Sequence, residues 1–407
     1  MHTGCGKRSL ALAGLGIPLQ KQRDTSRDSR RLNCYKKTPG PFGRKGENME
    51  MTLRWYGSGY DTVTLEQIRQ IPGVTGVITT LYGTKPGEVW SRRDIHGLKE
   101  EVEAAGLHIA GIESVNIHDA IKTGAPERDT YIDNYIATLR HLGQEDIHLV
   151  CYNFMPVFDW TRTELARKRP DGSTVLAYSQ KQVDALDPET MFASVDAGSG
   201  GFVMPGWEPD RLAHLKDLFA MYRQVDEEAL FANLKYFLER ILPVCREYDI
   251  SMAIHPDDPA WSVFGLPRII TCKENLLRMT KMVDDPHNGV TLCTGSLGTN
   301  PDNDLVDIIH SLKGRIHFAH VRNLKYNTRD DFEEAAHLSS DGSFDMYAIM
   351  KALYDIGFTG PIRPDHGRMI WGEKAMPGYG LYDRALGAAY LNGLWEAIEK
   401  QGKERSI

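Results

Sequence analysis

The sequence predicts one α/β domain that closes into a (β/α)8 TIM barrel, with a long insertion after the fourth strand. From residue 53 onward, short runs of apolar or β-branched residues alternate with longer amphipathic segments. This alternation is the pattern of repeated βα units around a parallel sheet. Eight such runs can be counted, and eight parallel strands are the number that closes this barrel.

The expected strands are short, and each is followed by a glycine, a proline or a polar residue. In chain order they are LRWYG from residue 53, GVITTL from 76, LHIAGIES from 107, DIHLVCYNF from 146, SMAIHP from 251, GVTLCTG from 289, RIHFAHVRN from 315 and GPIRPDHG from 360. Helical patterns separate them, for example over 64–70, 93–105 and 129–142. A longer helix is expected over 227–248, where the apolar residues form one stripe.

The insertion covers residues 156–225, between the fourth and fifth strands. It is irregular and contains Trp160, Trp207 and the run GSGG from residue 198. Loops of this length are usually functional or disordered, and in a barrel this one would rise from the catalytic face. We therefore expect a lid or a subunit contact there. A plain surface excursion is the alternative.

The first 48 residues differ in composition from the rest of the chain. They carry eleven Lys and Arg against three Asp and Glu, and they show no apolar period. A segment this polar cannot bury itself, so residues 1–48 are interpreted as a disordered or non-native basic leader. A basic targeting or binding arm is the alternative. The catalytic domain is expected to span residues 49–407, beginning near Met49 or Met51.

Composition excludes several functional classes. The chain after residue 48 is acidic and has no basic stripe, so nucleic acid is not an expected partner. No apolar run approaches the roughly 20 residues that a membrane span needs. The six cysteines are scattered without a CxxC pair, so we expect no disulfide framework and a cytoplasmic protein. The insertion and the acidic surface are compatible with a homo-oligomer.

Four residues of metal-binding type end the last four predicted strands. They are His255, Cys293, His320 and Asp365. Each alone would more often be structural, as a hydrogen-bonded histidine or a buried cysteine is. Together they are expected to converge at one rim, because active sites of this fold form where the strands end. Two nitrogens, a thiolate and a carboxylate would suit a divalent transition metal.

The chemistry of the predicted ligands limits the range of candidate metals but does not select one of them. A cysteine ligand favours zinc or ferrous iron, whereas a carboxylate and substrate oxygens suit manganese, iron or magnesium. A redox-neutral role with open coordination positions fits Mn²⁺ or Fe²⁺.

Other polar residues at the strand ends are candidates for substrate binding. An arginine could pair with a substrate carboxylate in a bidentate manner, although a surface ion pair is the alternative for each arginine. The amides and imidazole could contact sugar hydroxyls. The candidates are Arg322, Asn323, Arg368, Asn116, His118 and Asn153.

Several sequence runs resemble those of the mannonate dehydratase family. They are HPDDP from residue 255, CTGSLG from 293, HFAHVRN from 317, RPDHGR from 363, GYGLYDRALGAAYLNGL from 378, MTLRWYG from 51 and NIHDAIKTG from 116. The resemblance covers residue 49 to the C-terminus. It implies a (β/α)8 barrel with Mn²⁺ or Fe²⁺ that converts D-mannonate to 2-keto-3-deoxy-D-gluconate and water. It also implies that His255, Cys293, His320 and Asp365 are metal ligands and that His366 and Tyr379 transfer protons.

The implied reaction explains these residue types. Removing a proton next to a carboxylate makes a doubly charged species, which a cation must stabilise. A base must take the proton from C2, and an acid must protonate the departing C3 hydroxyl. The sequence does not decide which of His366 and Tyr379 plays which part.

Two other functions compete with this interpretation. A metal-dependent TIM-barrel sugar or sugar-acid isomerase or epimerase would share the fold, but such enzymes usually present several acidic ligands for two metals. A non-catalytic sugar-acid sensor would normally carry a DNA-binding or partner module, and no helix-turn-helix pattern lies outside the barrel. An assay with D-mannonate and manganese distinguishes all three.

Overall fold

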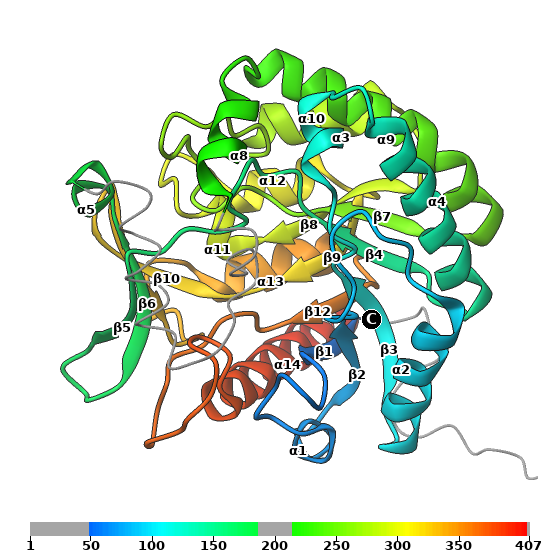
Figure 1. The fold of residues 1–407 in the computed structure, drawn as a ribbon. Helices are drawn as coiled ribbons and strands as arrows, with labels where there is room; N and C mark the ends of the chain where they lie inside the picture. Colours follow the sequence, from blue (N-terminus) through cyan, green and yellow to red (C-terminus); the bar gives the residue numbers. More distant parts are fainter. Residues whose placement is uncertain (1–48, 186–213, 405–407) are drawn as a thin grey trace, which may run out of the picture. The chain divides into compact units, whose positions relative to one another are not determined.

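A computed structural model of the chain describes residues 49–185 and 214–404, and it contains the closed barrel that the sequence predicts (Figure 1). The predicted leader 1–48 and part of the insertion lie outside the described residues. Every predicted strand is present. The barrel strands are β1 (Glu50–Arg54), β2 (Val74–Thr79), β3 (His108–Glu113), β4 (Leu149–Tyr152), β7 (Ser251–Ile254), β8 (Asn288–Cys293), β9 (Ile316–His320) and β12 (Pro361–Arg363).

All the barrel strands are parallel, and consecutive ones pair in chain order. The ring closes where β1 pairs with β12, through Glu50 opposite Pro361 and Met51 opposite Ile362. Parallel strands bring all of their C-terminal ends to one rim. Residues far apart in sequence therefore meet there.

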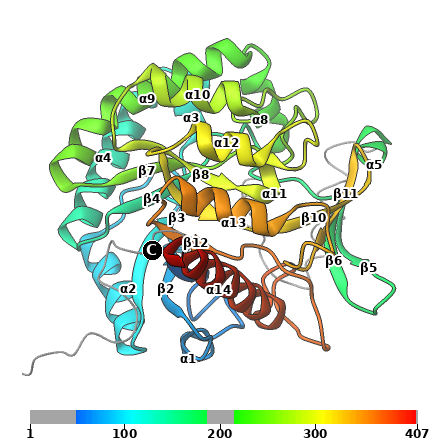
Figure 2. The same cartoon turned by 180° about the vertical axis from the view of Figure 1, so that it is seen from behind.

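Helices surround the barrel (Figures 1 and 2). The predicted helices appear within one or two residues of their expected ends, and the helix expected over 227–248 has those bounds. Its first turn is capped by Asp226, whose side chain accepts from the Ala229 amide. The helices are α1 (Leu65–Arg69), α2 (Arg92–Ala104), α3 (Asp119–Thr123), α4 (Arg128–Gln144), α5 (Gln180–Ala185), α8 (Leu215–Tyr222), α9 (Glu227–Tyr248), α10 (Lys273–Met282), α11 (Thr294–Leu297), α12 (Leu305–Ser311), α13 (Met346–Asp355) and α14 (Leu381–Glu404).

Two apolar clusters hold the barrel. The larger one includes the apolar stripe of α9 and many helix residues. The smaller one consists of strand residues alone: Ile78, Leu149, Cys151, Ala253 and Phe318. Phe318 is two residues before His320 on β9, so both side chains face the same side of the strand, and their rings lie 4.5 Å apart. The smaller cluster therefore fills the barrel beneath the rim at which His320 stands.

A second, four-stranded antiparallel sheet lies beside the barrel (Figure 1). Its strands are β5 (Glu164–Lys168), β6 (Thr174–Ser179), β10 (Asn323–Thr328) and β11 (Asp331–Ala335). One hairpin comes from the loop after β4 and the other from the loop after β9, and β11 pairs with β6. The expectation of an irregular stretch over 156–225 is corrected here, because its described part contains β5, β6, α5 and α8.

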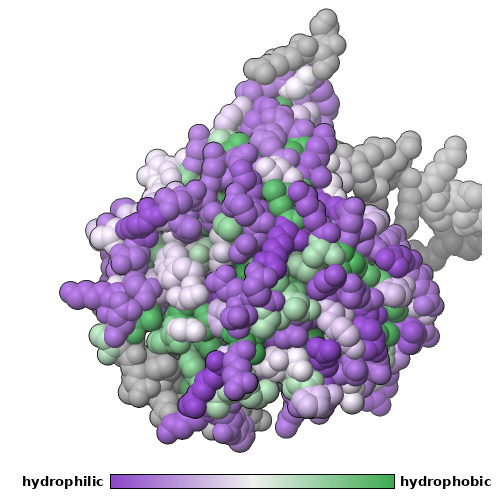
Figure 3. All heavy atoms as spheres, turned by 90° about the horizontal axis from the view of Figure 1, so that it is seen from above, coloured by the Kyte–Doolittle hydropathy of each residue, from purple (hydrophilic) through white to green (hydrophobic). Residues whose placement is uncertain are grey.

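The face of the molecule drawn in Figure 3 is mostly hydrophilic. In the view of Figure 3, apolar side chains appear in small groups between hydrophilic ones. Within residues 49–185 and 214–404, no helix is long and apolar enough to cross a membrane.

Candidate active site

The four predicted metal ligands come together at the rim of the barrel. One ligand atom from each of His255, Cys293 and His320 lies within 4.8 Å of the others, and His255 Nε2 is 3.2 Å from His320 Nδ1. Asp365 follows β12, and its Oδ2 lies 3.6 Å from Cys293 Sγ and 3.9 Å from His320 Nδ1. The rim thus presents nitrogen, sulfur and oxygen donors around one point.

Neighbouring groups orient both histidines. Nδ1 of His255 lies 2.7 Å from the carbonyl oxygen of Pro256, so an Nδ1–H would donate there and leave the Nε2 lone pair facing the cluster. On the other side of the His320 ring, Nε2 lies 3.4 Å from Oε2 of Glu113. A carboxylate or carbonyl behind the imidazole is the usual support of a metal-binding histidine.

The charges of the cluster also suit a cation. Burial raises the pKa of the Cys293 thiol, but the Arg322 guanidinium and His255 outweigh burial and hold this pKa well below its ordinary value. Sγ also accepts a hydrogen bond of 3.0 Å from the Ser296 hydroxyl. Burial likewise opposes ionisation of Asp365, whose pKa is nevertheless well below its usual range because of Arg363 and neighbouring histidines. A thiolate and a carboxylate are therefore available, as a divalent metal requires.

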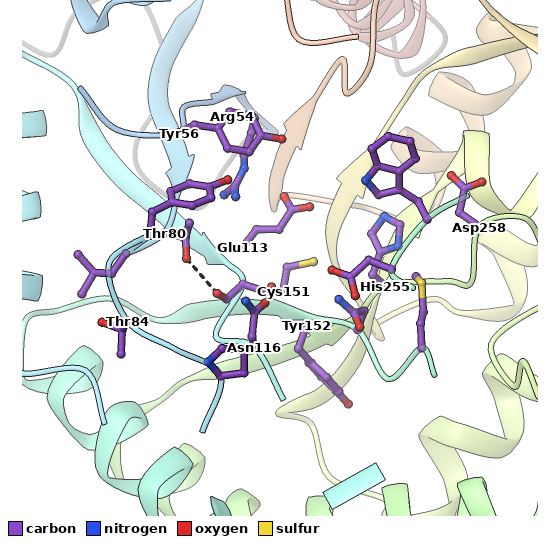
Figure 4. Close-up of a pocket in the computed structure, with 18 of the residues that line it drawn as sticks. Arg54, Tyr56, Thr80, Thr84, Glu113, Asn116, Cys151, Tyr152, His255 and Asp258 are labelled. Carbon is purple, nitrogen blue, oxygen red and sulfur yellow. Dashed lines mark hydrogen bonds between the residues drawn. The ribbon is translucent and has the colours of Figure 1, made fainter. Parts of the chain in front are cut away.

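A pocket of about 860 Å³ opens beside this cluster (Figure 4). Most of its lining residues lie at or just after the C-terminal ends of barrel strands. Figure 4 shows Arg54 and Tyr56 on one side of the pocket and His255 and Asp258 on the other, with Glu113 between them. The lining also includes Asn116, His118, Asn153, Trp160, Arg322, Arg363, Asp365, His366 and Tyr379.

The two predicted proton-transfer residues lie side by side in this pocket. Nε2 of His366 is 2.8 Å from the hydroxyl of Tyr379, and both side chains are almost fully buried. Burial and the nearby Asp365 carboxylate raise the pKa of Tyr379, so its hydroxyl keeps its proton at neutral pH. On the other side of the His366 ring, Nδ1 lies 3.2 Å from Oε1 of Glu334.

Glu334 belongs to a buried ion network that joins the second sheet to the rim. It accepts from Arg162 at 2.9 Å and from Arg322. Burial opposes ionisation of Glu334, but Arg322, His366 and Arg162 lower its pKa to about 2. Asp258 completes the network, since it accepts from Arg162 at 2.7 Å and from Arg322 at 2.7 Å. The carboxylate behind His366 is therefore charged and fixed in place.

Arg322 borders the pocket, but its donors point into the protein. Besides Glu334 and Asp258, its Nε lies 2.7 Å from Asp365 Oδ2, and its side chain is 1% exposed. In the structure, Arg322 therefore holds Asp365 in place and lowers the pKa of Cys293. Its donors contact these protein groups and do not form a free anchor for a substrate.

Asn323 and Arg368 are not among the residues that line the pocket. Asn323 begins β10, where its side chain donates to the Leu338 carbonyl and accepts from the Phe344 amide, both at 3.0 Å. Arg368 donates to the buried Asp383 at 2.9 Å. Both side chains are thus held by protein partners outside the pocket, and their contact with the substrate stays a prediction.

The other predicted substrate-binding residues do line the pocket. Asn116 accepts from the Ser114 hydroxyl at 2.9 Å. His118 caps α3, because its Nδ1 accepts from the Ala120 amide at 3.1 Å. Asn116, His118 and Asn153 therefore remain candidates for contact with sugar hydroxyls.

The pocket and network residues that the sequence analysis did not single out include Arg54, Tyr56, Glu113 and Glu334. The first three lie at or just after the ends of β1 and β3, so the rule that directed attention to the last four strand ends would have found them on the first strands. Glu334 carried no such signal, because it lies on a hairpin that the sequence did not predict.

The fold and the site define a (β/α)8-barrel enzyme whose pocket carries a donor cluster suited to one divalent metal. Residues 49–405 match the family model described as D-mannonate dehydratase (UxuA). The chain belongs to the mannonate dehydratase family, as its sequence motifs predicted.

Individual relatives agree with this assignment. A mannonate dehydratase of Brachyspira hyodysenteriae is 68% identical over 355 residues, which cover 87% of this chain and all of the relative. One of Thermotoga petrophila is 58% identical over 357 residues, covering 87% of this chain and 99% of the relative. The crystal structure of mannonate dehydratase from Streptococcus suis serotype 2 superimposes with a TM-score of 0.79 at 44% identity, covering 87% of this chain and 96% of that one.

Proposed function

We propose that this enzyme removes water from D-mannonate to give 2-keto-3-deoxy-D-gluconate, with one bound Mn²⁺ or Fe²⁺, in the pocket beside the donor cluster. The observation that carries the proposal is the position of the His366–Tyr379 pair next to Asp365. This arrangement puts a proton acceptor and a proton donor beside a candidate metal ligand, in a pocket large enough for a six-carbon acid. Family membership supports the same reaction.

The residues that would hold the metal are His255, Cys293, His320 and Asp365. The donor set fits because it offers two imidazole nitrogens, a thiolate and a carboxylate, with the His255 ring oriented by a backbone carbonyl. A bound divalent cation supplies stabilisation of the negative charge that develops next to the substrate carboxylate.

The remaining steps belong to the protein's own groups. His366 takes the proton from C2, and the Glu334 carboxylate behind Nδ1 stabilises the imidazolium that forms. Tyr379, which burial keeps protonated, gives its proton to the departing C3 hydroxyl, which leaves as water. The resulting enol takes up a proton at C3 and gives up the proton of its C2 hydroxyl, which makes it the 2-keto-3-deoxy acid. One proton is removed and one is delivered before ketonisation, so the elimination balances.

The direct test is to incubate the purified protein with D-mannonate and Mn²⁺ and to measure formation of a 2-keto-3-deoxy acid. D-gluconate, which differs only at C2, is the matched control substrate. Product from D-mannonate is the expected result. A protein that holds its metal but forms no keto-acid would contradict the proposal. Conversion of a sugar or sugar acid into its isomer would support the isomerase alternative.

Glu334 provides a sharper test of the proton-transfer roles. Glu334→Gln should lower kcat about 10- to 100-fold with little change in KM, the usual cost of losing a carboxylate behind a functional imidazole. Metal content and thermal melting separate this effect from loss of the Arg162 and Arg322 contacts. The adjacent Glu333, which pairs with Arg169 at 3.2 Å, supplies the control. A Glu334→Gln enzyme with the kcat of Glu333→Gln would remove Glu334 from the mechanism.

We further propose that the enzyme works in the cytoplasm as a homo-oligomer. Cys151, Cys245, Cys272 and Cys293 are free thiols, which suits a reducing compartment. The described part of the insertion after β4 and the exposed pair Trp371 and Tyr382, whose rings lie 5.5 Å apart, are the surfaces that we assign to contact with a second copy. Light scattering measures the mass in solution.

A further inference from the structure

Arg54, the last residue of β1, is a buried cation that the proposed mechanism leaves unused. It is 5% exposed and lines the pocket. Its Nη1 is buried without a hydrogen-bond partner, and within the described ranges no carboxylate forms an ion pair with it. Figure 4 shows the side chain pointing into the pocket toward Glu113.

The other two arginines that line the described pocket are already paired. Arg363 lies 2.9 Å from Glu113 and 2.9 Å from Asp365. Arg322 lies 2.7 Å from Asp258 and 2.7 Å from Asp365. Glu113 also attracts the Arg54 charge, but no hydrogen-bond acceptor contacts Arg54 Nη1, and Arg54 lines the pocket.

A buried donor without a hydrogen-bond acceptor is destabilising. A guanidinium cannot lose its proton in a protein, and although Glu113 attracts the Arg54 charge, the unsatisfied Nη1 still carries a free-energy cost. The Tyr56 ring, whose centroid lies 4.6 Å from the Arg54 guanidinium carbon, recovers only part of this cost. An anionic ligand that enters the pocket would supply the missing partner.

Arg54 is also on the side of the pocket where the proposed chemistry takes place. The Tyr56 ring beneath it meets the Tyr379 ring edge-on, with centroids 4.9 Å apart. An anion held by Arg54 would therefore lie near the His366–Tyr379 pair. In D-mannonate the one charged group is the carboxylate, and it is bonded to C2, from which His366 takes its proton.

We propose that Arg54 binds the substrate carboxylate and makes the pocket select a sugar acid over the neutral polyol of the same shape. The identity of the acid rests on the proposed function, but the selection for a carboxylate rests on Arg54 itself. A planar guanidinium whose Nη1 lacks a hydrogen-bond partner binds a carboxylate more strongly than it binds a neutral hydroxyl. Arg54 thus takes the part that the sequence suggested for Arg322 or Arg368.

The test compares D-mannonate with D-mannitol, which replaces the carboxylate by a hydroxymethyl group. Binding is measured by calorimetry on metal-loaded protein in a His366→Asn background, which prevents turnover, and KM is measured in the otherwise native enzyme. Arg54→Met should raise the Kd and KM for D-mannonate about 10- to 100-fold and leave the Kd for D-mannitol nearly unchanged. Arg54→Lys keeps the positive charge but loses the planar, two-pronged donor geometry. Its Kd and KM for D-mannonate should therefore lie between those of the native enzyme and those of Arg54→Met.

Arg278→Met is the matched control. Arg278 pairs with Glu228 at 2.6 Å on exposed helix surfaces, and its loss should change neither constant. Equal weakening of D-mannonate and D-mannitol would show that Arg54 binds a hydroxyl, and an unchanged Kd would show that it binds neither; both outcomes overturn the proposal. If Arg54→Met has a lowered melting temperature or loses metal, the same comparison of the Kd for D-mannonate with the Kd for D-mannitol is made in Arg54→Lys and is judged by the same criteria. Selective binding without turnover by the native enzyme would contradict the proposed function alone.

Discussion

Cys293→Ala is expected to lose bound metal and dehydratase activity together. Cys293 Sγ stands with His255, His320 and Asp365 at the rim, and its pKa is lowered so that a thiolate is available. Changing only an outer partner of a ligand weakens metal binding about 10- to 100-fold, so removal of the ligand itself should cost more. His320→Ala should behave in the same way. Elemental analysis and the D-mannonate assay, run on the same preparations, measure both losses.

The control for this experiment is Cys245→Ala. Cys245 is a buried free thiol of α9 and is not among the residues that line the pocket. It should keep its metal and its activity, apart from a small loss of stability caused by the missing sulfur. Full metal occupancy in both Cys293→Ala and His320→Ala would show that the ligand set is wrong.

His366→Asn should abolish turnover while metal stays bound. The imidazole lies between the Tyr379 hydroxyl and the Glu334 carboxylate, and it is not one of the atoms that cluster at the rim. Positioned acid–base groups contribute about 10²- to 10⁴-fold to a rate, so kcat should fall by at least that factor. Asparagine keeps a polar group of similar size, which limits the effect on packing. Single-turnover kinetics and metal analysis provide the measurement.

His310→Asn is the matched control for this second variant. His310 lies on the exposed surface of α12 and should tolerate the change with a normal rate. Near-normal rates in His366→Asn would exclude His366 from the mechanism. Loss of metal in His366→Asn would place it among the ligands instead.

The barrel and its donor cluster could be predicted because both depend on local sequence patterns. Each barrel strand is a short apolar run, such as Ser251–Ile254, and closure of parallel strands brings their ends to one rim. Once eight strands were recognised, the meeting of His255, Cys293, His320 and Asp365 followed from topology. The prediction did not require these four residues to be close to one another in the sequence.

The second sheet was missed because its strands are polar and pair across long separations. β11 reads DFEEA, which lacks the apolar run of a buried strand, and it pairs with β6 more than 150 residues earlier in the chain. The direction in which each side chain points could not be predicted from the sequence either. Arg368 follows Asp365 closely in sequence, yet it turns to Asp383, whereas Arg54 faces the pocket from the first strand.

The joining of β6 to β11 has a consequence for how this enzyme can change. Arg162 lies just before β5 and reaches Glu334 on β11, which in turn reaches His366. Shortening or exchanging the loop after β4 would therefore remove Arg162, one of the two arginines that hold the Glu334 carboxylate against the histidine that handles the proton. Engineers who graft a new loop at this position should retain Arg162, or expect to redesign the acid–base pair along with the surface.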